Sequence, residues 1–530
     1  MHTVQLILRP AEYEKAVINK RFHAVSHIHN VCVKHARKLL MRLDHDKEYQ
    51  SWRSEYCKLL KQKKLSKADR TRRLELSKQM SARRQEIGLS KWALQSYIKV
   101  CGKRYSKLIS SQQVQAEAAN VWTGVEKCLF SKGKDIHFKK FMDFDTIGGK
   151  SNLNGARLNP DTMTVSWLGL ELKCYLPKKA SDRDYVLESL VHKISYCTIK
   201  RMMFLNGWRY YLAVTLDGNA PYRERKVKTG VMGIDPGVST MAAVSDTACI
   251  LEELAPDADV YEKQIHKLEQ HMDASKRISN PDNFNPDGTV KKRRDCKPWV
   301  FSNSYRAARR KRKTLYRKKS AYILHSHRNL CNRLLENADS FIVEKMDYAA
   351  LAKRSSKTER QDKPTDVVQK DDTVKTVNKF KRRKRFGRSI NRRSPSRFLS
   401  ELKRKAESSG GTYAEVNTQT FKASQYNHVT DECVKVPLSQ RFKLIGNDSV
   451  QRDLYSAFLI KNTDSAFEHP DMDKCIYEFE SFVAVHNETI NYMKESKISM
   501  KQCFGFLTAK TSRITANFQI KRGPASLPRP

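Results

Sequence analysis

The stretch Val231-Met232-Gly233-Ile234-Asp235-Pro236-Gly237-Val238-Ser239-Thr240 decides the fold of this chain, and an apolar run, residues 241–244, follows it. It reads as a buried strand that carries one carboxylate, Asp235, then a tight turn and a second strand. A carboxylate inside an apolar run is costly to bury unless it is paired, hydrogen-bonded or bound to a metal. The stretch therefore predicts a strand pair whose carboxylate needs a partner.

Two more acidic residues stand at the ends of apolar segments farther along the chain. Glu344 ends the strand-like Phe341-Ile342-Val343, and Asp453 opens an apolar segment, residues 454–460. Three such carboxylates suggest one metal site, because hard divalent cations prefer oxygen ligands. Each also has a purely structural interpretation: Asp235 can shape its turn, Glu344 can pair with a lysine, and Asp453 can cap its helix.

Three segments resemble the split nuclease motifs of a known family. Residues 233–237, 343–346 and 451–457 are similar, in this order, to the three RuvC motifs of the TnpB family. That family comprises transposon-encoded RNA-guided DNA endonucleases and is related to type V CRISPR effectors and Fanzor. The resemblance implies that Asp235, Glu344 and Asp453 are catalytic and hold two Mg²⁺ ions about 4 Å apart, with Mn²⁺ as an alternative cation. Asp235 would bridge the ions, and the other two carboxylates would each complete one coordination shell.

The resemblance also implies a multidomain α+β protein. Its parts would be an RNase H-like (RuvC) mixed α/β nuclease domain split in sequence, a small β-barrel wedge domain and an inserted α-helical recognition lobe. The expected boundaries are residues 1–20 for a wedge strand, 21–127 for the helical lobe, 128–226 for the wedge barrel, 227–352 for the first nuclease part with a basic bridging helix, 353–395 for a basic flexible insertion, 396–424 for the second nuclease part, 425–447 for a degenerate, zinc-less target-loading segment, 448–521 for the third nuclease part and 522–530 for a disordered tail.

Local patterns predict the elements inside these parts. Residues 1–10 read as a strand, and alternation at Met163, Val165 and Trp167 favours strands in the barrel region. Residues 199–205 and 208–216 read as a hairpin with a type I′ turn at Asn206-Gly207. The expected helices cover residues 22–43, 52–84, 92–108, 114–126, 305–335, 398–408, 473–493 and 500–511, and residues 257–292 are expected to be loops with one short helix.

The chain is strongly basic. Its 530 residues include 101 Lys and Arg against 57 Asp and Glu, a formal charge of +44, while its apolar fraction of 39% is low but still globular. This charge predicts a polyanionic partner, with a merely basic soluble protein as the alternative. No segment has the 18 or so apolar residues of a membrane span, and the N-terminus does not read as a signal sequence. We therefore expect no membrane partner and a prokaryotic cytoplasmic location, at the nucleoid when DNA is bound.

Two basic segments are the candidate nucleic-acid contacts. Residues 305–335 read as a helix so cationic that it repels itself unless it lies along phosphates. Residues 353–393 read as an insertion that is mobile until it clamps nucleic acid, although a nuclear localisation signal has a similar composition. The candidates are Arg309, Arg310, Arg312, Lys313 and Arg317 in the helix, Lys381, Arg382, Arg383, Lys384 and Arg385 in the insertion, and Arg441 and Arg452 as contacts to the scissile phosphate.

The chain departs from the family where most members carry two CxxC pairs that bind a structural zinc. After Gln425, His428 and Cys433 are the main candidate zinc ligands, and they cannot by themselves supply four tetrahedral positions. We therefore predict no structural zinc, which leaves the target-loading role of this segment open. The 12 cysteines are scattered and indicate reduced thiols rather than disulfides.

These features favour an RNA-guided DNA endonuclease whose partners are a guide RNA and a double-stranded DNA target. Base pairing would supply specificity, and the protein would read a short motif beside the target and form an R-loop. A nuclease-inactive RNA-guided DNA-binding protein, acting as a repressor or a transposition-targeting subunit, is the alternative. A guide-independent junction resolvase is a third, although it needs far less chain before Asp235. The sequence leaves open the origin of the guide, from a transposon end or a CRISPR array, and whether the protein is a monomer or a dimer.

Overall fold

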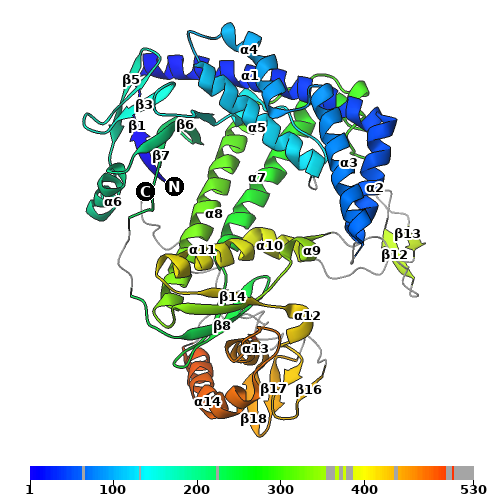
Figure 1. Cartoon of the computed structure of the whole chain (residues 1–530), viewed down its shortest axis with the longest axis vertical. Coiled ribbons are helices and arrows are strands. Elements are labelled where there is room, and N and C mark those ends of the chain that lie inside the picture. The colour runs from blue at the N-terminus through cyan, green and yellow to red at the C-terminus, as the bar shows by residue number, and fades with distance from the viewer. Residues whose placement is uncertain are drawn as a thin grey trace. The chain divides into compact units, whose positions relative to one another are not determined.

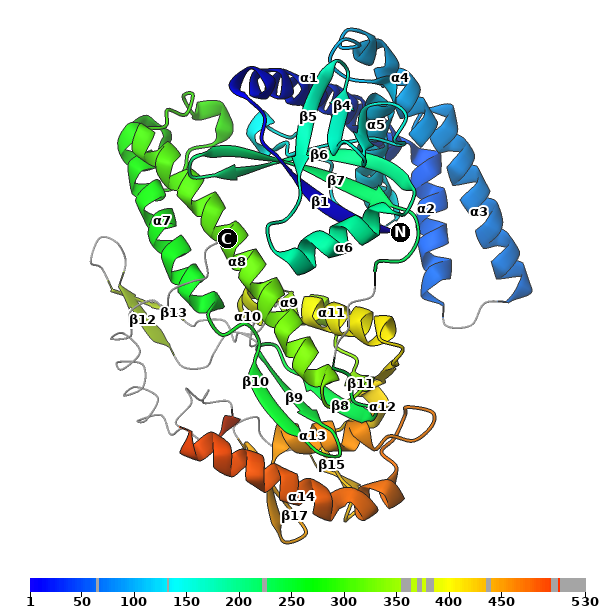
Figure 2. The same ribbon diagram turned by 90° about the vertical axis from the view of Figure 1, so that its left-hand side faces the viewer.

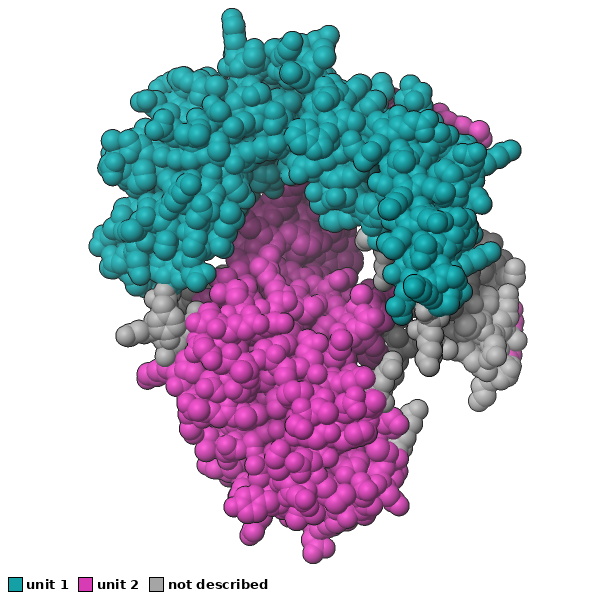
Figure 3. Space-filling view, in the orientation of Figure 1, with its two compact units in different colours: residues 1–222 teal, residues 223–530 magenta. Residues whose placement is uncertain are grey.

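A computed structural model describes most of the chain as two compact units, residues 1–222 and residues 223–530, which Figure 3 colours separately. The insertion residues 381–385, the expected helix 500–511 apart from residues 504–505, and the expected tail all lie outside the described residues. The described ranges are residues 1–62, 66–130, 133–221, 226–353, 364–368, 374–377, 386–434, 440–496 and 504–505.

Unit 1 contains one antiparallel sheet with the strand order β2-β6-β7-β1-β5-β4-β3. The N-terminal strand lies in the middle of it, as the sequence predicted, and the sheet curls (Figure 2). Among the described residues no ladder joins β2 to β3, so the sheet is half of the expected barrel. The strands are β1 His2–Leu8, β2 Thr146–Gly148, β3 Ala156–Asn159, β4 Thr164–Trp167, β5 Leu170–Tyr175, β6 Ile194–Phe204 and β7 Gly207–Leu216.

The helices of unit 1 form with the sheet a single apolar core. The buried positions of α1 recur at helical spacing from Phe22 to Leu43, which confirms the predicted pattern. Leu6 of β1, Ile28 of α1, Val121 of α5 and Trp167 of β4 belong to the same buried cluster. The division of this region into a lobe and a barrel stays a prediction. The helices are α1 Glu12–His45, α2 Lys47–Lys61, α3 Lys67–Glu86, α4 Lys91–Lys103, α5 Ser111–Phe130 and α6 Ala180–Leu190, with a short 3₁₀ turn at Phe141–Asp143.

Two buried arginines join the helices to the sheet of unit 1. Arg21 of α1 donates to the carbonyl oxygens of Trp167 (2.5 Å) and Leu168 (2.8 Å) beyond β4. Arg201 of β6 donates to the carbonyl oxygens of Phe144 (2.9 Å) and Phe141 (2.6 Å). Burial lowers the pKa of each guanidinium to about 10, so both remain charged at neutral pH. These bonds satisfy backbone groups that would otherwise be costly to bury.

The hairpin of β6 and β7 is confirmed, but its predicted turn is wrong. Phe204 pairs with Gly207, so Leu205 and Asn206 form the turn. A type I′ turn needs a positive φ at both central residues. Here the positive φ, 113°, is at Gly207, one position later. The glycine therefore follows the turn instead of forming its second corner.

Unit 2 contains a mixed five-stranded sheet with the order β10-β9-β8-β11-β14, and Figure 2 labels the first four of these strands. β8, β11 and β14 run parallel, whereas β9 is antiparallel to both of its neighbours. The predicted strands around Asp235 and before Glu344 are thus neighbours in one sheet. The strands are β8 Val231–Pro236, β9 Thr240–Val244, β10 Cys249–Glu253, β11 Ser340–Glu344 and β14 Tyr413–Val416.

Helices cover both faces of this sheet. Leu330 and Leu334 of α8 (Asn303–Leu335) pack with Phe398 of α11 (Pro395–Ser408) against one face. α13 (Arg452–Lys461) and α14 (Met472–Glu495) pack against the other. The basic helix at residues 305–335 is confirmed as α8. The short helix expected within residues 257–292 is wrong, because α7 (Ala258–Ser279) spans 22 residues and lies alongside α8 (Figure 1).

The remaining elements of unit 2 are short. The helix expected at residues 398–408 is confirmed as α11, which ends at Ser408 and is followed by Gly410 with φ of 82°. The mixed α+β class is confirmed, and no helix in the described ranges is long and apolar enough to traverse a bilayer. The short elements are β12 Thr365–Val368, β13 Val374–Val377, β15 Tyr426–Asn427, β16 Glu432–Cys433, β17 Phe442–Ile445, β18 Asp448–Gln451, α9 Tyr348–Ala352, α10 Gly387–Arg393, α12 Thr418–Phe421 and 3₁₀ turns at Pro281–Asn283 and Arg293–Asp295.

Candidate active site

Strand alternation directs Asp235 and Glu344 toward the same face of the unit 2 sheet. Ile234 and Val343 are buried against α8 and α11, so the residues beside them point to the opposite face, where α13 lies. Ile234 and Val343 are partners in the parallel ladder of β8 and β11. The next residues along each strand, Asp235 and Glu344, are therefore adjacent at the carboxyl ends of two parallel strands.

The two side chains share a hydrogen bond. Burial raises the pKa of Asp235 well above its usual range, and the negative charges of Glu344 and Asp453 raise it further, against the opposing charge of Arg452. Burial also raises the pKa of Glu344, while its bond to Asp235 lowers it. Both the burial and the neighbouring negative charges favour the protonated form of Asp235, with Asp235 as the donor and the Glu344 carboxylate as the acceptor of their hydrogen bond. Among the described residues no lysine pairs with Glu344, so that structural interpretation fails.

Gly233 brings α13 close to the strand that carries Asp235. A Cβ atom at Gly233 would lie 2.1 Å from the carbonyl oxygen of Ala457 and 2.3 Å from the backbone nitrogen of Lys461. From Ala457 back to Asp453 the helix advances about 6 Å. From Gly233 forward to Asp235 the strand advances about 6.6 Å. The two distances from the contact at Gly233, one along α13 and one along β8, are nearly equal. The close approach at Gly233 therefore places Asp453 near Asp235.

Asp453 lies in the first turn of α13 but does not cap it. The cap is Gln451, whose Oε1 accepts from the backbone nitrogen of Leu454 at 2.8 Å. The Asp453 carboxylate instead pairs with Arg452 (Nη2–Oδ1, 2.9 Å) and Arg441 (Nη1–Oδ2, 3.7 Å). Its charge still reaches Asp235, whose pKa it raises. The three predicted carboxylates thus share one electrostatic neighbourhood, with the third held by arginines.

Because Asp453 pairs with Arg452 and Arg441, the three carboxylates do not form a preorganised metal site. Within the described ranges, no group of three or more His, Cys, Asp and Glu side chains has the arrangement of a metal site. Asp235 and Glu344 are hydrogen-bonded to each other, whereas the Asp453 carboxylate forms ion pairs with Arg452 and Arg441. Both arginines lie beside the third carboxylate, and their predicted contact with the scissile phosphate stays a prediction.

Two residues that support this site were missed from the sequence. Tyr348 Oη bonds to the carbonyl oxygens of Pro236 (3.1 Å) and Gly237 (3.2 Å), which holds the turn after Asp235. His486 of α14 accepts the backbone N–H of Gln451 at Nε2 (2.9 Å), and burial lowers its pKa, which favours the neutral ring. Neither residue is part of the pattern that marked the carboxylates, a single charged residue beside an apolar run. Only the fold brings Tyr348 and His486 to the site.

The basic helix α8 is partly neutralised by its neighbour α7. Arg312 pairs with Glu269 at 3.3 Å, and the buried Lys319 pairs with Glu262. The expectation that α8 repels itself unless it meets phosphate therefore omitted the acidic residues of α7. Arg310 is exposed, and Arg309, Lys313 and Arg317 are partly exposed, so their contact with nucleic acid stays a prediction.

The predicted zinc-less segment uses His428 in the core. Its Nδ1 is hydrogen-bonded to Tyr455 Oη at 2.8 Å, and its ring packs against Phe479 and Phe458. Burial lowers its pKa, so the ring is neutral. Cys433 is exposed on β16. The absence of structural zinc stays a prediction from the ligand count.

No protein-family model and no curated protein matches this chain. Solved structures do match it. The protein of a Cas12f1–sgRNA–target DNA complex aligns with a TM-score of 0.43 and 11% identity, over 87% of this chain and 98% of that one. A CRISPR-Cas12f ternary complex aligns with a TM-score of 0.24 and 12% identity, over 88% of this chain and 99% of that one. At such TM-scores the function has to be argued from the geometry of the site.

Proposed function

We propose that this protein is an RNA-guided DNA endonuclease of the TnpB and type V CRISPR kind. It would bind a guide RNA, read a short motif beside its target, form an R-loop and hydrolyse DNA phosphodiesters at Asp235, Glu344 and Asp453. The observation that supports this most is the hydrogen-bonded acidic pair at the carboxyl ends of β8 and β11. The order β10-β9-β8-β11-β14, with β9 antiparallel, agrees with an RNase H-like nuclease domain.

The acidic pair fits a divalent cation. Its donors are carboxylate oxygens, the ligand atoms that Mg²⁺ prefers. Burial and mutual repulsion disfavour two adjacent carboxylates when both are ionised, and a bound cation would offset this cost. Asp235 and Glu344 would hold Mg²⁺, and Asp453 would join them once it leaves its arginines. The bound ion would lower the pKa of water and stabilise the leaving oxygen. Tyr348 keeps the Asp235 turn in place, and Arg452 and Arg441 would bind the scissile phosphate.

One observation favours the alternative, a nuclease-inactive RNA-guided binder. Asp453 is neutralised by Arg452 and Arg441, so a ready three-carboxylate site is not preformed. A binder of this kind would keep RNA-programmed DNA binding without cutting. The two functions are separated by assaying binding and cleavage on the same DNA.

The proposed function is tested with RNA that co-purifies with the full chain. The RNA is sequenced, and the complex is incubated with Mg²⁺ and plasmids that carry the matching sequence beside randomised flanks. Cleavage should require the match, a short flanking motif and Mg²⁺. Binding without cleavage would instead establish the inactive binder. Mg²⁺-dependent cutting that ignores the RNA sequence would contradict guidance.

Mg²⁺ affinity should rise with pH. The pKa of Asp235 is raised, so below its folded-state pKa the cation must displace the proton shared with Glu344. We expect the association constant to rise about tenfold per pH unit until Asp235 ionises. Calorimetry in two buffers of different ionisation enthalpy should detect the released proton. An affinity that does not change with pH would contradict the shared proton.

Replacing Arg452 by glutamine should act on two properties in opposite directions. DNA cleavage should fall about 10- to 100-fold, because a charge-assisted phosphate contact is lost. Mg²⁺ affinity without DNA should rise, because Asp453 loses its 2.9 Å partner. Arg404→Gln, at an exposed arginine on α11, is the charge-matched control. A fall in both properties would indicate a purely structural role for Arg452.

A further inference from the structure

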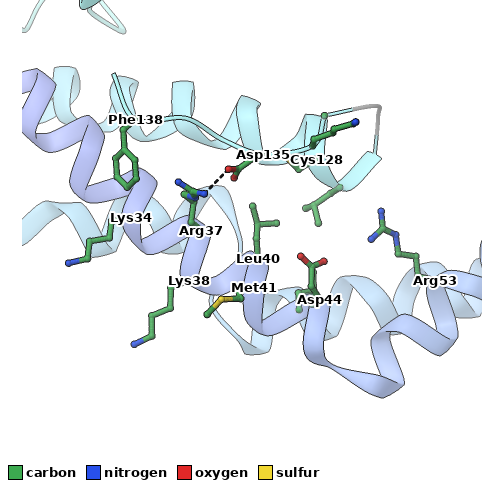
Figure 4. Close-up of a pocket in the computed structure, with 14 residues that line it drawn as sticks. Lys34, Arg37, Lys38, Leu40, Met41, Asp44, Arg53, Cys128, Asp135 and Phe138 are labelled. Atoms are coloured by element: carbon green, nitrogen blue, oxygen red, sulfur yellow. Dashed lines mark hydrogen bonds and ion pairs between the residues drawn. The ribbon is translucent and has the colours of Figure 1, made fainter. Parts of the chain in front are cut away.

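Unit 1 contains a cavity of about 600 Å³ that the proposed nuclease function does not use (Figure 4). It is formed by α1, α2, the end of α5 and the segment that follows α5. Its volume is in the range of sites for small molecules. Leu40, Leu43 and Leu129 form an apolar floor, and Phe138, whose ring is 51% exposed, stands at one end.

The rim of this cavity is cationic. Its lining includes five basic residues against two acidic ones, Asp44 and Asp135. Arg37 pairs with Asp135 at 2.7 Å and lies 5.5 Å from the centre of the Phe138 ring. Among the described residues no ion pair engages the other four, which are Lys34, Lys38, Arg53 and Lys134. In Figure 4, Lys34 and Phe138 lie toward one end and Arg53 toward the other.

The wall of the cavity is held in place by specific contacts. Gly133 donates to the Lys127 carbonyl oxygen at 3.0 Å, and a Cβ there would lie 2.8 Å from that backbone, so this close approach requires glycine. Asn30 of α1 exchanges two hydrogen bonds with the backbone of Lys139, at 2.9 and 3.0 Å. These contacts pin the wall to α1, so the cavity exists before any ligand arrives.

We propose that this cavity binds one unpaired nucleotide of a single-stranded nucleic acid. A base has an apolar face for the leucine floor and a π-face for Phe138, while its phosphates suit Lys34, Lys38 and Arg53. A free phosphate would leave the floor unused, and a neutral apolar ligand would leave the cations unpaired. The site goes beyond the proposed function, because pairing with a guide keeps bases inside a double helix, whereas this cavity would bind a base that is not paired.

The test uses oligouridylate and oligodeoxyuridylate of equal length, which differ only in the sugar, each with or without one central abasic site. They are titrated into the full chain carrying Asp235→Asn, so that no strand is cut. The intact strands should bind about fivefold to a hundredfold tighter than the abasic ones. Uridine monophosphate should compete with the intact strand. A preference between the two sugars tells whether RNA or DNA is the natural source.

Two variants separate stacking from charge. Phe138→Ala should abolish the preference for the intact strand and leave the salt dependence unchanged, whereas Trp92→Ala, at an exposed tryptophan of α4, should change neither. Lys38→Glu should weaken all strands and flatten the salt dependence more than Lys78→Glu on α3 does. Equal binding of intact and abasic strands would overturn the proposal, as would competition by an acidic peptide but not by uridine monophosphate. Neither result bears on cleavage, so the nuclease proposal stands or fails separately.

Discussion

Replacing Asp235 by asparagine should lower Mg²⁺-dependent DNA cleavage by about a thousandfold or more, because the carboxylate placed to bridge the cations is lost. Guide and target binding should remain nearly intact, since the side chain keeps its size and no basic residue is changed. Cleavage is measured on the RNA-matched plasmid and binding on the same DNA by gel shift. Asp473→Asn, at an exposed carboxylate in α14, is the matched control and should cut normally.

The same variant should be more stable than the wild type when metal is absent. The folded-state pKa of Asp235 lies above its unfolded value, so the native state holds more protons in the window between the two. The free energy of unfolding of the wild type therefore falls as pH rises through that window. An asparagine has no proton to lose and removes this slope. Thermal unfolding with EDTA and then with Mg²⁺ checks it: Mg²⁺ should raise the melting temperature of the wild type only. Normal cutting by Asp235→Asn would rule out the assigned site.

Replacing Gly233 by alanine should disrupt unit 2. The added methyl group would lie 2.1 and 2.3 Å from backbone atoms of Ala457 and Lys461, and backbone atoms of a packed helix cannot rotate away as a side chain does. α13 would have to leave β8, at a cost of about 4 kcal/mol or more. Its apolar side chains are almost entirely buried, so moving it opens the core that they fill.

Thermal unfolding and limited proteolysis measure this effect. Gly148→Ala in β2 is the control, because a methyl group there meets only an ordinary contact at 3.7 Å. We expect fragments from unit 2 to appear in the Gly233 variant while unit 1 persists. A variant that melts at the wild-type temperature would show that α13 does not rest on β8 in solution.

The carboxylates could be predicted because each breaks an apolar run. Asp235 and Glu344 end strands in sequence, and parallel neighbours bring such ends together. The pairing of Asp453 with Arg441 could not be predicted, because it depends on the loop before β17, far from α13 in the strand pattern. The roles of Tyr348 and His486 could not be predicted either. Both side chains contact backbone atoms, which every residue carries, so no sequence pattern marks their partners.

Two predictions of secondary structure were wrong, each for its own reason. Residues 257–292 look polar, but α7 needs only a few buried positions, such as Ile265 and Met272, because α8 covers it along its length. The turn of the β6 and β7 hairpin was displaced because Gly207 suits a corner and also the position after it. For α7 a tertiary neighbour, and not local preference, decided between two acceptable structures.

The arginines Arg21 and Arg201 limit how this protein can be re-engineered. Each anchors one part of unit 1 through carbonyl oxygens of another. A chimaera that exchanged α1 would remove Arg21 and leave the carbonyl oxygens of Trp167 and Leu168 without their donor. One that exchanged residues 141–144 would leave the buried Arg201 guanidinium among backbone groups that do not match it. Grafts should therefore keep residues 1–221 together as one cassette and place the junction after them.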